Sequence, residues 1–293
     1  MSQQRPAVFP KISPFAWALL LFFLAGPAWG EQPQNQPQDK PASAEAAAEA
    51  DRKASLQAYL KGYYFDTKAI LTAPARWDTQ DWLVAGAVVG VAAGLYAYDQ
   101  DLKEWAQKRR NGTTDDIARF AEPFGKGLYT VPALGLLYAY GYAVEDGKAR
   151  ETALLGVESF VISQVFTQTL KYATHRRRPD DGLRYDRWGG PGFSGEDRSF
   201  PSAETTAAFS VATVIASEYD NTIYVPVIAY GIASMTALSR INDNDHWASD
   251  VFAGAAIGYF TARFLTRLHK NSRFAILPLL ENGRQGLALA YRF

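Results

Sequence analysis

The sequence contains no cysteine, which excludes disulfide bonds and thiol chemistry. Its 30 basic and 30 acidic residues balance, so the 293-residue chain lacks the excess positive charge with which nucleic-acid-binding proteins neutralise phosphate backbones. Alternating, strand-like apolar patterns are also missing before about residue 271. We therefore expect no nucleic-acid partner and a fold without a central sheet.

Helical patterns fill the middle of the chain, separated by charged turns or turns marked by Gly and Pro. They cover about 80–98, 115–121, 127–144, 150–173, 204–218, 223–239 and 247–269. With 48% hydrophobic residues the chain is able to bury a sizeable core. The sequence predicts an all-α fold, a bundle of about six core helices over residues 80–270.

The N-terminus has the pattern of a secretory signal peptide. Two basic residues precede an apolar run over 15–24, and small residues fill the −3 and −1 positions of a cleavage site that ends at Gly30. We expect a signal peptide over 1–30, with an uncleaved membrane anchor as the alternative.

Three further segments flank the predicted bundle. Residues 31–50 are rich in Gln, Pro and Ala and predict a disordered linker, because they offer too little apolar surface to offset the entropy of ordering. Residues 51–79 are amphipathic and predict a satellite helix. Asn282-Gly283 between two apolar runs predicts a short C-terminal β-hairpin over 271–293.

Three chemically active residues lie within twelve positions of one another: Arg240, His246 and Asp250. His246 and Asp250 are four apart, so on a helix they share one face. A carboxylate that accepts a hydrogen bond from one imidazole nitrogen fixes the tautomer and leaves the other nitrogen free to attack. The alternative is a solvated helix start that Asp243 or Asp245 caps.

Two more polar stretches lie upstream. Lys171, His175 and Arg178 belong to a dense positive cluster that ends an apolar helix at Pro179. It also fits a basic helix C-terminus or a flank beside a membrane. Ser202 precedes a helix, whose first N–H groups suit a phosphate, although an ordinary N-cap explains the same pattern.

Taken together, the three stretches resemble the signature of the type 2 phosphatidic acid phosphatase family, which includes bacterial class A acid phosphatases and vanadium haloperoxidases. The resemblance covers about residues 80 to 270. It is carried by Lys171 with Arg178-Pro179, then Pro201-Ser202, then Ser239-Arg240 with His246 and Asp250.

The resemblance implies a metal-independent, cofactor-free phosphatase, or a vanadate-dependent haloperoxidase if the site holds vanadate. By the same analogy His246 attacks phosphorus and Asp250 orients it. The implied phosphate ligands are Lys171, Arg178, Ser202, the backbone around Ala203, and Arg240.

The second stretch departs from the family pattern, because Ala203 and Glu204 stand where the family has Gly and a proton-donating His. Cations nearby should lower the pKa of Glu204 and make it a poor acid. Three outcomes are open. The chain binds phosphate with weak or no turnover; His175 replaces the acid; or the substrate has a leaving group, such as phosphate from a diphosphate, that needs little protonation.

Several helical runs, such as 82–98, are apolar for about 17 residues, the lower limit for crossing a bilayer. Abundant Ala, Gly, Ser and Thr and a mean hydropathy of −0.18 favour a soluble bundle. The number of crossings also favours a soluble bundle. If the N-terminus is exported, a third crossing at 150–173 would end in the cytoplasm and would place the three motifs there, on the wrong side for an exported enzyme. We expect a periplasmic, soluble or surface-attached bundle. The alternative is an integral inner-membrane protein whose site faces the periplasm.

From these features we expect an exported phosphatase or diphosphatase that acts on a lipid phosphate or an isoprenyl diphosphate. Its partners would be a phosphorylated lipid or small phosphate ester and a membrane surface. The alternatives are a non-catalytic phosphate-binding pseudoenzyme, which Glu204 favours, and a vanadate-dependent haloperoxidase. The sequence does not indicate an oligomeric state.

Overall fold

A computed structural model describes residues 61–193, 198–271, 274–281 and 284–291 of the chain. The predicted signal peptide and linker, residues 1–50, lie outside the described residues.

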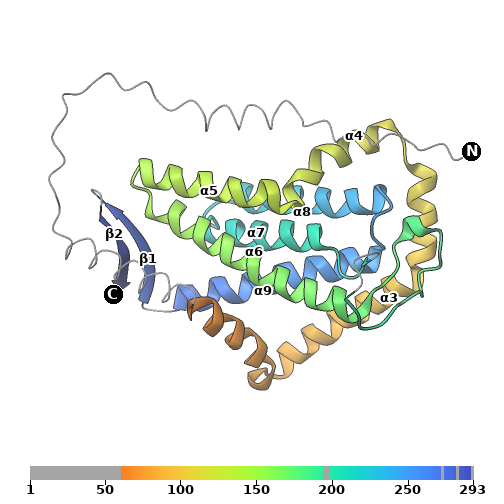
Figure 1. Ribbon diagram of the computed structural model, residues 1–293, viewed down its shortest axis with the longest axis horizontal. Helices are drawn as coiled ribbons and strands as arrows, with labels where there is room; N and C mark the ends of the chain where they lie inside the picture. The colour runs from red at the N-terminus through yellow and green to blue at the C-terminus, as the bar shows by residue number, and fades with distance from the viewer. Residues whose placement is uncertain (1–60, 194–197, 272–273, 282–283, 292–293) are drawn as a thin grey trace, which may run out of the picture. The chain divides into compact units, whose positions relative to one another are not determined.

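The described residues form eight α-helices (Figure 1). A helix over 61–72 comes first, followed by α3 (Thr79–Arg109), α4 (Gly112–Ala121), α5 (Gly127–Ala143), α6 (Gly147–Thr174), α7 (Ala203–Glu218), α8 (Tyr224–Asn242) and α9 (Ala248–Asn271). The all-α prediction for the bundle is confirmed, but about six core helices was too low a count. One reason is that α4, which the pattern predicted only over 115–121, is a ten-residue helix.

Side-chain caps explain where several helices begin. Asp78 accepts from the Asp81 N–H at 2.9 Å and Asp81 bonds back, so α3 starts at Thr79 in a capping box. Asn111 and Thr114 form a second box at the start of α4. No Gly or Pro interrupts residues 99–109, so α3 continues for 31 residues, well past the end of its apolar run.

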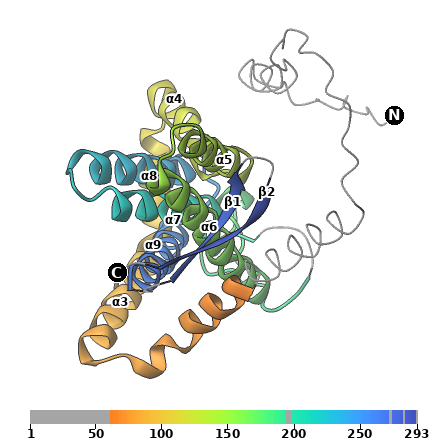
Figure 2. The ribbon, with the colours of Figure 1, turned by 90° about the vertical axis from the view of Figure 1, so that its left-hand side faces the viewer.

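Helix α7 lies in the middle of the bundle, with α6, α8 and α9 packed around it (Figure 2). Its side chains are mostly small or hydroxylated, and Thr167 of α6 bonds Thr206 of α7 at 3.1 Å. Gly254 and Gly258 of α9 face α7 so closely that a Cβ on Gly258 would lie 2.4 Å from the Thr206 carbonyl oxygen. Small residues thus allow two helix backbones to approach each other closely.

Large apolar side chains lie instead on the outer faces of α3, α5 and α8. Exposed examples are Trp82, Leu83, Val89 and Val91 of α3, Leu128, Leu136 and Tyr140 of α5, and Tyr224, Val227 and Ile228 of α8. Helices α3, α6 and α8 are long and apolar enough to cross a membrane, and none of the most apolar part of α3 is buried. The composition, the mean hydropathy and the number of crossings favoured a soluble bundle, in which these side chains would be buried. Their exposure favours the integral-membrane alternative, because a bilayer is the solvent that suits such a surface.

The helix over 61–72 contacts the bundle through apolar side chains. Tyr63 and Ile70 pack against a buried cluster that contains Leu155 and Ile162 of α6 and Leu265 of α9. This helix therefore packs against the middle of α6 and the C-terminal part of α9.

Two strands follow the bundle in sequence, β1 (Phe274–Glu281) and β2 (Arg284–Tyr291). They pair antiparallel, with Phe274 opposite Tyr291 and Glu281 opposite Arg284. Residues 282–283, the predicted turn, lie outside the described residues, so the C-terminal hairpin stays a prediction.

The close approach of α7 and α9 predicts that Gly258→Ala destabilises the protein by about 1–3 kcal/mol, the usual result of adding a methyl group where no space exists. The matched control is Gly94→Ala in α3, where a Cβ would meet nothing within 4 Å. Thermal unfolding in detergent should show a lower midpoint for Gly258→Ala and an unchanged or higher one for Gly94→Ala. Equal midpoints would contradict the packing described.

Candidate active site

The three predicted motifs meet at one end of the bundle, where α6 and α8 end and α7 and α9 begin. The Ser202 N–H donates to the Asp250 carbonyl at 3.0 Å, which joins the starts of α7 and α9. The His246 N–H donates to the Arg240 carbonyl at 3.3 Å, which folds the loop between α8 and α9 back on itself. Residues far apart in sequence are thereby fixed by backbone contacts.

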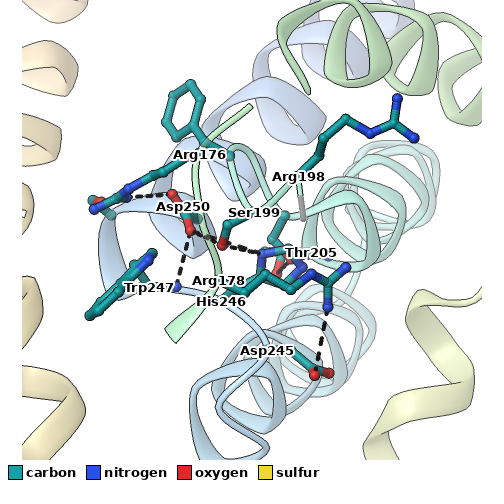
Figure 3. Close-up of polar contacts among 12 residues, drawn as sticks. Arg176, Arg178, Arg198, Ser199, Thr205, Asp245, His246, Trp247 and Asp250 are labelled. Carbon is teal, nitrogen blue, oxygen red and sulfur yellow. Dashed lines mark hydrogen bonds and ion pairs between the residues drawn. The ribbon is translucent and has the colours of Figure 1, made fainter. Parts of the chain in front are cut away.

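His246 precedes α9 and is almost fully buried. Its Nδ1 lies 4.0 Å from Asp250 Oδ2, too far for the direct hydrogen bond that helical spacing predicted. Ser199 stands between them: its Oγ donates to Asp250 Oδ2 at 2.5 Å and lies 3.3 Å from His246 Nδ1 (Figure 3). Because the hydroxyl proton goes to Asp250, the oxygen is left to accept from Nδ1–H. This tautomer leaves Nε2 as the reactive nitrogen.

Glu204, in the first turn of α7, faces that reactive nitrogen. Its Oε2 lies 3.4 Å from His246 Nε2. Burial raises the pKa of Glu204, but the hydrogen bond and charge of His246 and the charge of Arg240 outweigh it, so its pKa lies below the ordinary value. Glu204 is therefore ionised at neutral pH. The Glu204 carboxylate thus lies beside the nitrogen that a substrate phosphorus atom would have to approach.

The predicted phosphate-binding cations are held by acceptors of the chain. Lys171 is buried and its Nζ donates to the carbonyl oxygen of Arg198 at 2.6 Å. Arg240 donates to Asp245 and to Asp243, each at 3.0 Å.

Asp245 also links the two predicted arginine ligands, since its other oxygen lies 3.7 Å from Arg178. Burial raises the pKa of Asp245, although Arg240, His246 and Arg178 act to lower it. An incoming anion must therefore compete with Asp245 for the arginines and with Glu204 for His246.

Ser202 is the N-cap of α7. Its Oγ accepts from the Thr205 N–H at 3.4 Å and from the Thr205 hydroxyl at 2.9 Å. Ala203 is the first residue of the helix, and its carbonyl accepts from Gln164 at 2.8 Å. The first N–H groups of a helix lack helical partners, so this end suits an anion. The cap and phosphate-site interpretations are therefore compatible.

His175 ends α6 in a left-handed conformation, with φ of 41°. Its Nδ1 lies 2.9 Å from the Gly190 carbonyl oxygen, so the ring is anchored to the loop that follows. Gly192 lies against the same ring. Its service as a replacement acid stays a prediction.

Sequence reasoning missed the residues that hold Asp250. Arg176 donates to Asp250 Oδ1 at 2.5 Å and to Asp99 Oδ2 at 2.7 Å, and all three side chains are fully buried. Asp99 also accepts from the Ser249 N–H at 2.9 Å. Figure 3 shows Arg176 and Ser199 on opposite sides of the Asp250 carboxylate. Asp250 is thus oriented from one side and acts on His246 from the other.

Aromatic rings surround the Arg176 guanidinium. Tyr96 and Trp188 lie 4.9 Å from it and Trp247 lies 5.4 Å from it. Such faces favour a cation and exclude water. In the sequence, Arg176 is one of several positive residues in the basic cluster, and nothing singles it out. Asp99 belongs to no local sequence pattern.

Comparison with known proteins finds a family that matches this part of the chain. Residues 152–274 match the model of the PAP2 superfamily. A segment of 89 residues, 30% of this chain, is 39% identical to the lipid A 1-phosphatase of Porphyromonas gingivalis and covers 17% of that protein. Another of 167 residues, 50% of this chain, is 30% identical to a PA-phosphatase related-family protein of Dictyostelium discoideum and covers 61% of it. The chain thus spans less than two thirds of either relative.

Among solved structures, the crystal structure of LpxE from Aquifex aeolicus is similar, with a TM-score of 0.47 and 22% identity. The match covers 57% of this chain and 94% of that one. A likeness this weak does not describe the activity of this chain.

The buried ion pairs predict that Asp99→Asn lowers the free energy of unfolding by about 3 kcal/mol, because Arg176 loses a charged partner where no water replaces it. Asp116→Asn is the matched control, since its ion pair with Arg119 is exposed on both sides. Chemical denaturation should separate the two variants. Equal effects would contradict the assignment of Arg176 and Asp99 as a buried support.

Proposed function

Because this chain belongs to the PAP2 superfamily through residues 152–274, we propose that it is a membrane-embedded phosphatase of lipid phosphates or diphosphates that forms a phosphohistidine on His246. The observation that carries the proposal is the buried relay from Asp250 through Ser199 to His246 Nδ1, which leaves Nε2 as the nucleophile. Cations from α6, α8 and the loop after α6 lie around the same helix ends.

The chemistry proceeds in two steps. In the first, the Nε2 lone pair of His246 forms a bond to phosphorus, and the leaving oxygen departs with the electrons of the P–O bond. Lys171, Arg178 and Arg240 stabilise the charge on the other phosphoryl oxygens, the main source of catalysis in such transfers. In the second step, water attacks phosphorus, the N–P bond breaks, and inorganic phosphate and His246 are released.

Glu204 favours a leaving group that needs no proton. Its lowered pKa leaves it ionised, so it has no proton to donate at neutral pH. An alkoxide is a poor leaving group without a proton, whereas phosphate leaves a diphosphate as a stable anion. We therefore rank a lipid diphosphate, such as an isoprenyl diphosphate, above an alkyl monoester as the substrate.

Exposed apolar side chains support a lipid substrate and a site at a membrane. The outer faces of α3, α5 and α8 would contact acyl chains, and three helices have the length to cross a bilayer. The names of relatives, among them lipid A 1-phosphatase and a lipid phosphate phosphatase of Arabidopsis thaliana, agree with a phosphorylated lipid. Export and a site that faces the periplasm remain part of the proposal.

A second candidate function is phosphate binding without turnover. The contact of Glu204 with His246 Nε2 favours this second candidate, because the carboxylate occupies the place that the substrate phosphorus atom would have to enter. A substrate must displace Glu204 before the first step. Vanadate would bind the same cations, and halide oxidation with added vanadate is the test for the haloperoxidase alternative.

We predict a strong dependence of rate on the leaving group. The wild-type chain should release phosphate from an isoprenyl diphosphate and from activated aryl monoesters but hardly from alkyl monoesters. In Glu204→His the rate on alkyl monoesters should rise by about 10²-fold or more, because a general acid is worth roughly 10²–10⁴-fold. The measurement is the initial rate on a series of aryl and alkyl phosphates. The slope of the logarithm of this rate against the pKa of the leaving group gives the dependence.

Two further variants serve as controls. Glu204→Gln removes the negative charge but donates no useful proton, so its slope should stay as steep as in the wild type. His246→Asn should abolish release from every substrate. A shallow slope in the wild type would contradict the leaving-group argument, and vanadate binding without any phosphate release would favour the second candidate.

A further inference from the structure

A second cluster of ligand-type side chains lies away from the phosphate site. Asp66 of the helix over 61–72, Glu158 of α6 and His269 of α9 bring one ligand atom each to within 4.8 Å of one another. Figure 1 shows the three elements that supply them. Glu158 precedes Lys171 by 13 positions on α6, so the two sites are about 20 Å apart along that helix.

The two distances from His269 to the carboxylates match a tetrahedral metal site. His269 Nε2 lies 3.2 Å from Asp66 Oδ2 and 3.5 Å from Glu158 Oε2. Zinc bonds of about 2.0–2.1 Å at tetrahedral angles place neighbouring ligand atoms roughly 3.3–3.4 Å apart. We propose that Asp66, Glu158 and His269 form a zinc site that clips the helix over 61–72 to α6 and α9.

The charges of the three groups support a dication. Glu158 and Asp66 bring two carboxyl groups together in a place where the side chain of Glu158 is 8% exposed and that of Asp66 is 17% exposed. Buried charge without compensation is costly. A dication held between the two carboxylates would balance their charge.

The cluster is also accessible to an ion and to water. The side chain of His269 is 43% exposed, so one side of the cluster is open to an entering ion and to water as a fourth ligand. One imidazole nitrogen with two carboxylate oxygens suits zinc better than magnesium or calcium, which prefer oxygen ligands alone. The ligands come from segments 203 residues apart, so the ion would hold distant parts of the chain together.

The test is zinc binding by the full chain, purified without a histidine tag and freed of metal with EDTA. Calorimetry should give one zinc per chain, and zinc should raise the thermal unfolding midpoint where magnesium does not. Glu158→Gln and His269→Gln each remove a ligand. Each should weaken zinc binding by more than the roughly 10–100-fold that the loss of an outer-shell partner costs.

Glu218→Gln is the matched control, because it removes a carboxylate that pairs with Lys270 beside the same helix end. It should bind zinc as tightly as the wild type does. If Glu158→Gln does not fold, His269→Gln still tests the site. The His269 side chain is partly exposed, so we expect the fold to tolerate its substitution. The proposal is overturned if no stoichiometric zinc binds, or if both ligand variants bind it as tightly as the wild type; the cluster is then a hydrogen-bonded ion pair alone.

Discussion

The active end of this protein depends on one buried cation, Arg176, held between the carboxylates of Asp99 and Asp250. None of the three side chains contacts solvent, so each charge relies on the others for stabilisation. Because Asp99 lies on α3 and Asp250 on α9, the interaction joins two helices that no motif connects. Its second consequence is chemical: the fixed Asp250 positions Ser199, and Ser199 fixes the tautomer of His246.

The same need for charge compensation explains the surroundings of the nucleophile. Asp245 links Arg178 and Arg240, and Glu204 faces His246 Nε2, so acidic groups of the chain face the cations that are proposed to bind phosphate. Substituting Glu for the usual His thus replaces a proton donor with an internal anion. Under the proposed function, this exchange favours substrates whose leaving group departs without a proton, and a diphosphate has that property.

Sequence reasoning predicted six site residues from short motifs, and the structure places them at the same end of the bundle, although their roles stay predictions: Lys171, Arg178, Ser202, Arg240, His246 and Asp250. It missed Asp99 because that contact depends on the long polar extension of α3, 77 positions before Arg176. It missed the role of Ser199 because α9 begins only after His246, which lengthens the distance to Asp250. It also favoured a soluble bundle, because hydropathy measures how apolar a helix is and not which way its side chains face.

The measurement that tests this account most directly is the isolation of a phosphorylated intermediate. The wild-type chain is mixed with an isoprenyl diphosphate labelled at the terminal phosphorus, and the reaction is stopped with base within one turnover. We expect acid-labile, base-stable label on the peptide that contains His246, and no label in His246→Asn. Turnover without labelled protein, or label on another residue, would contradict the central claim.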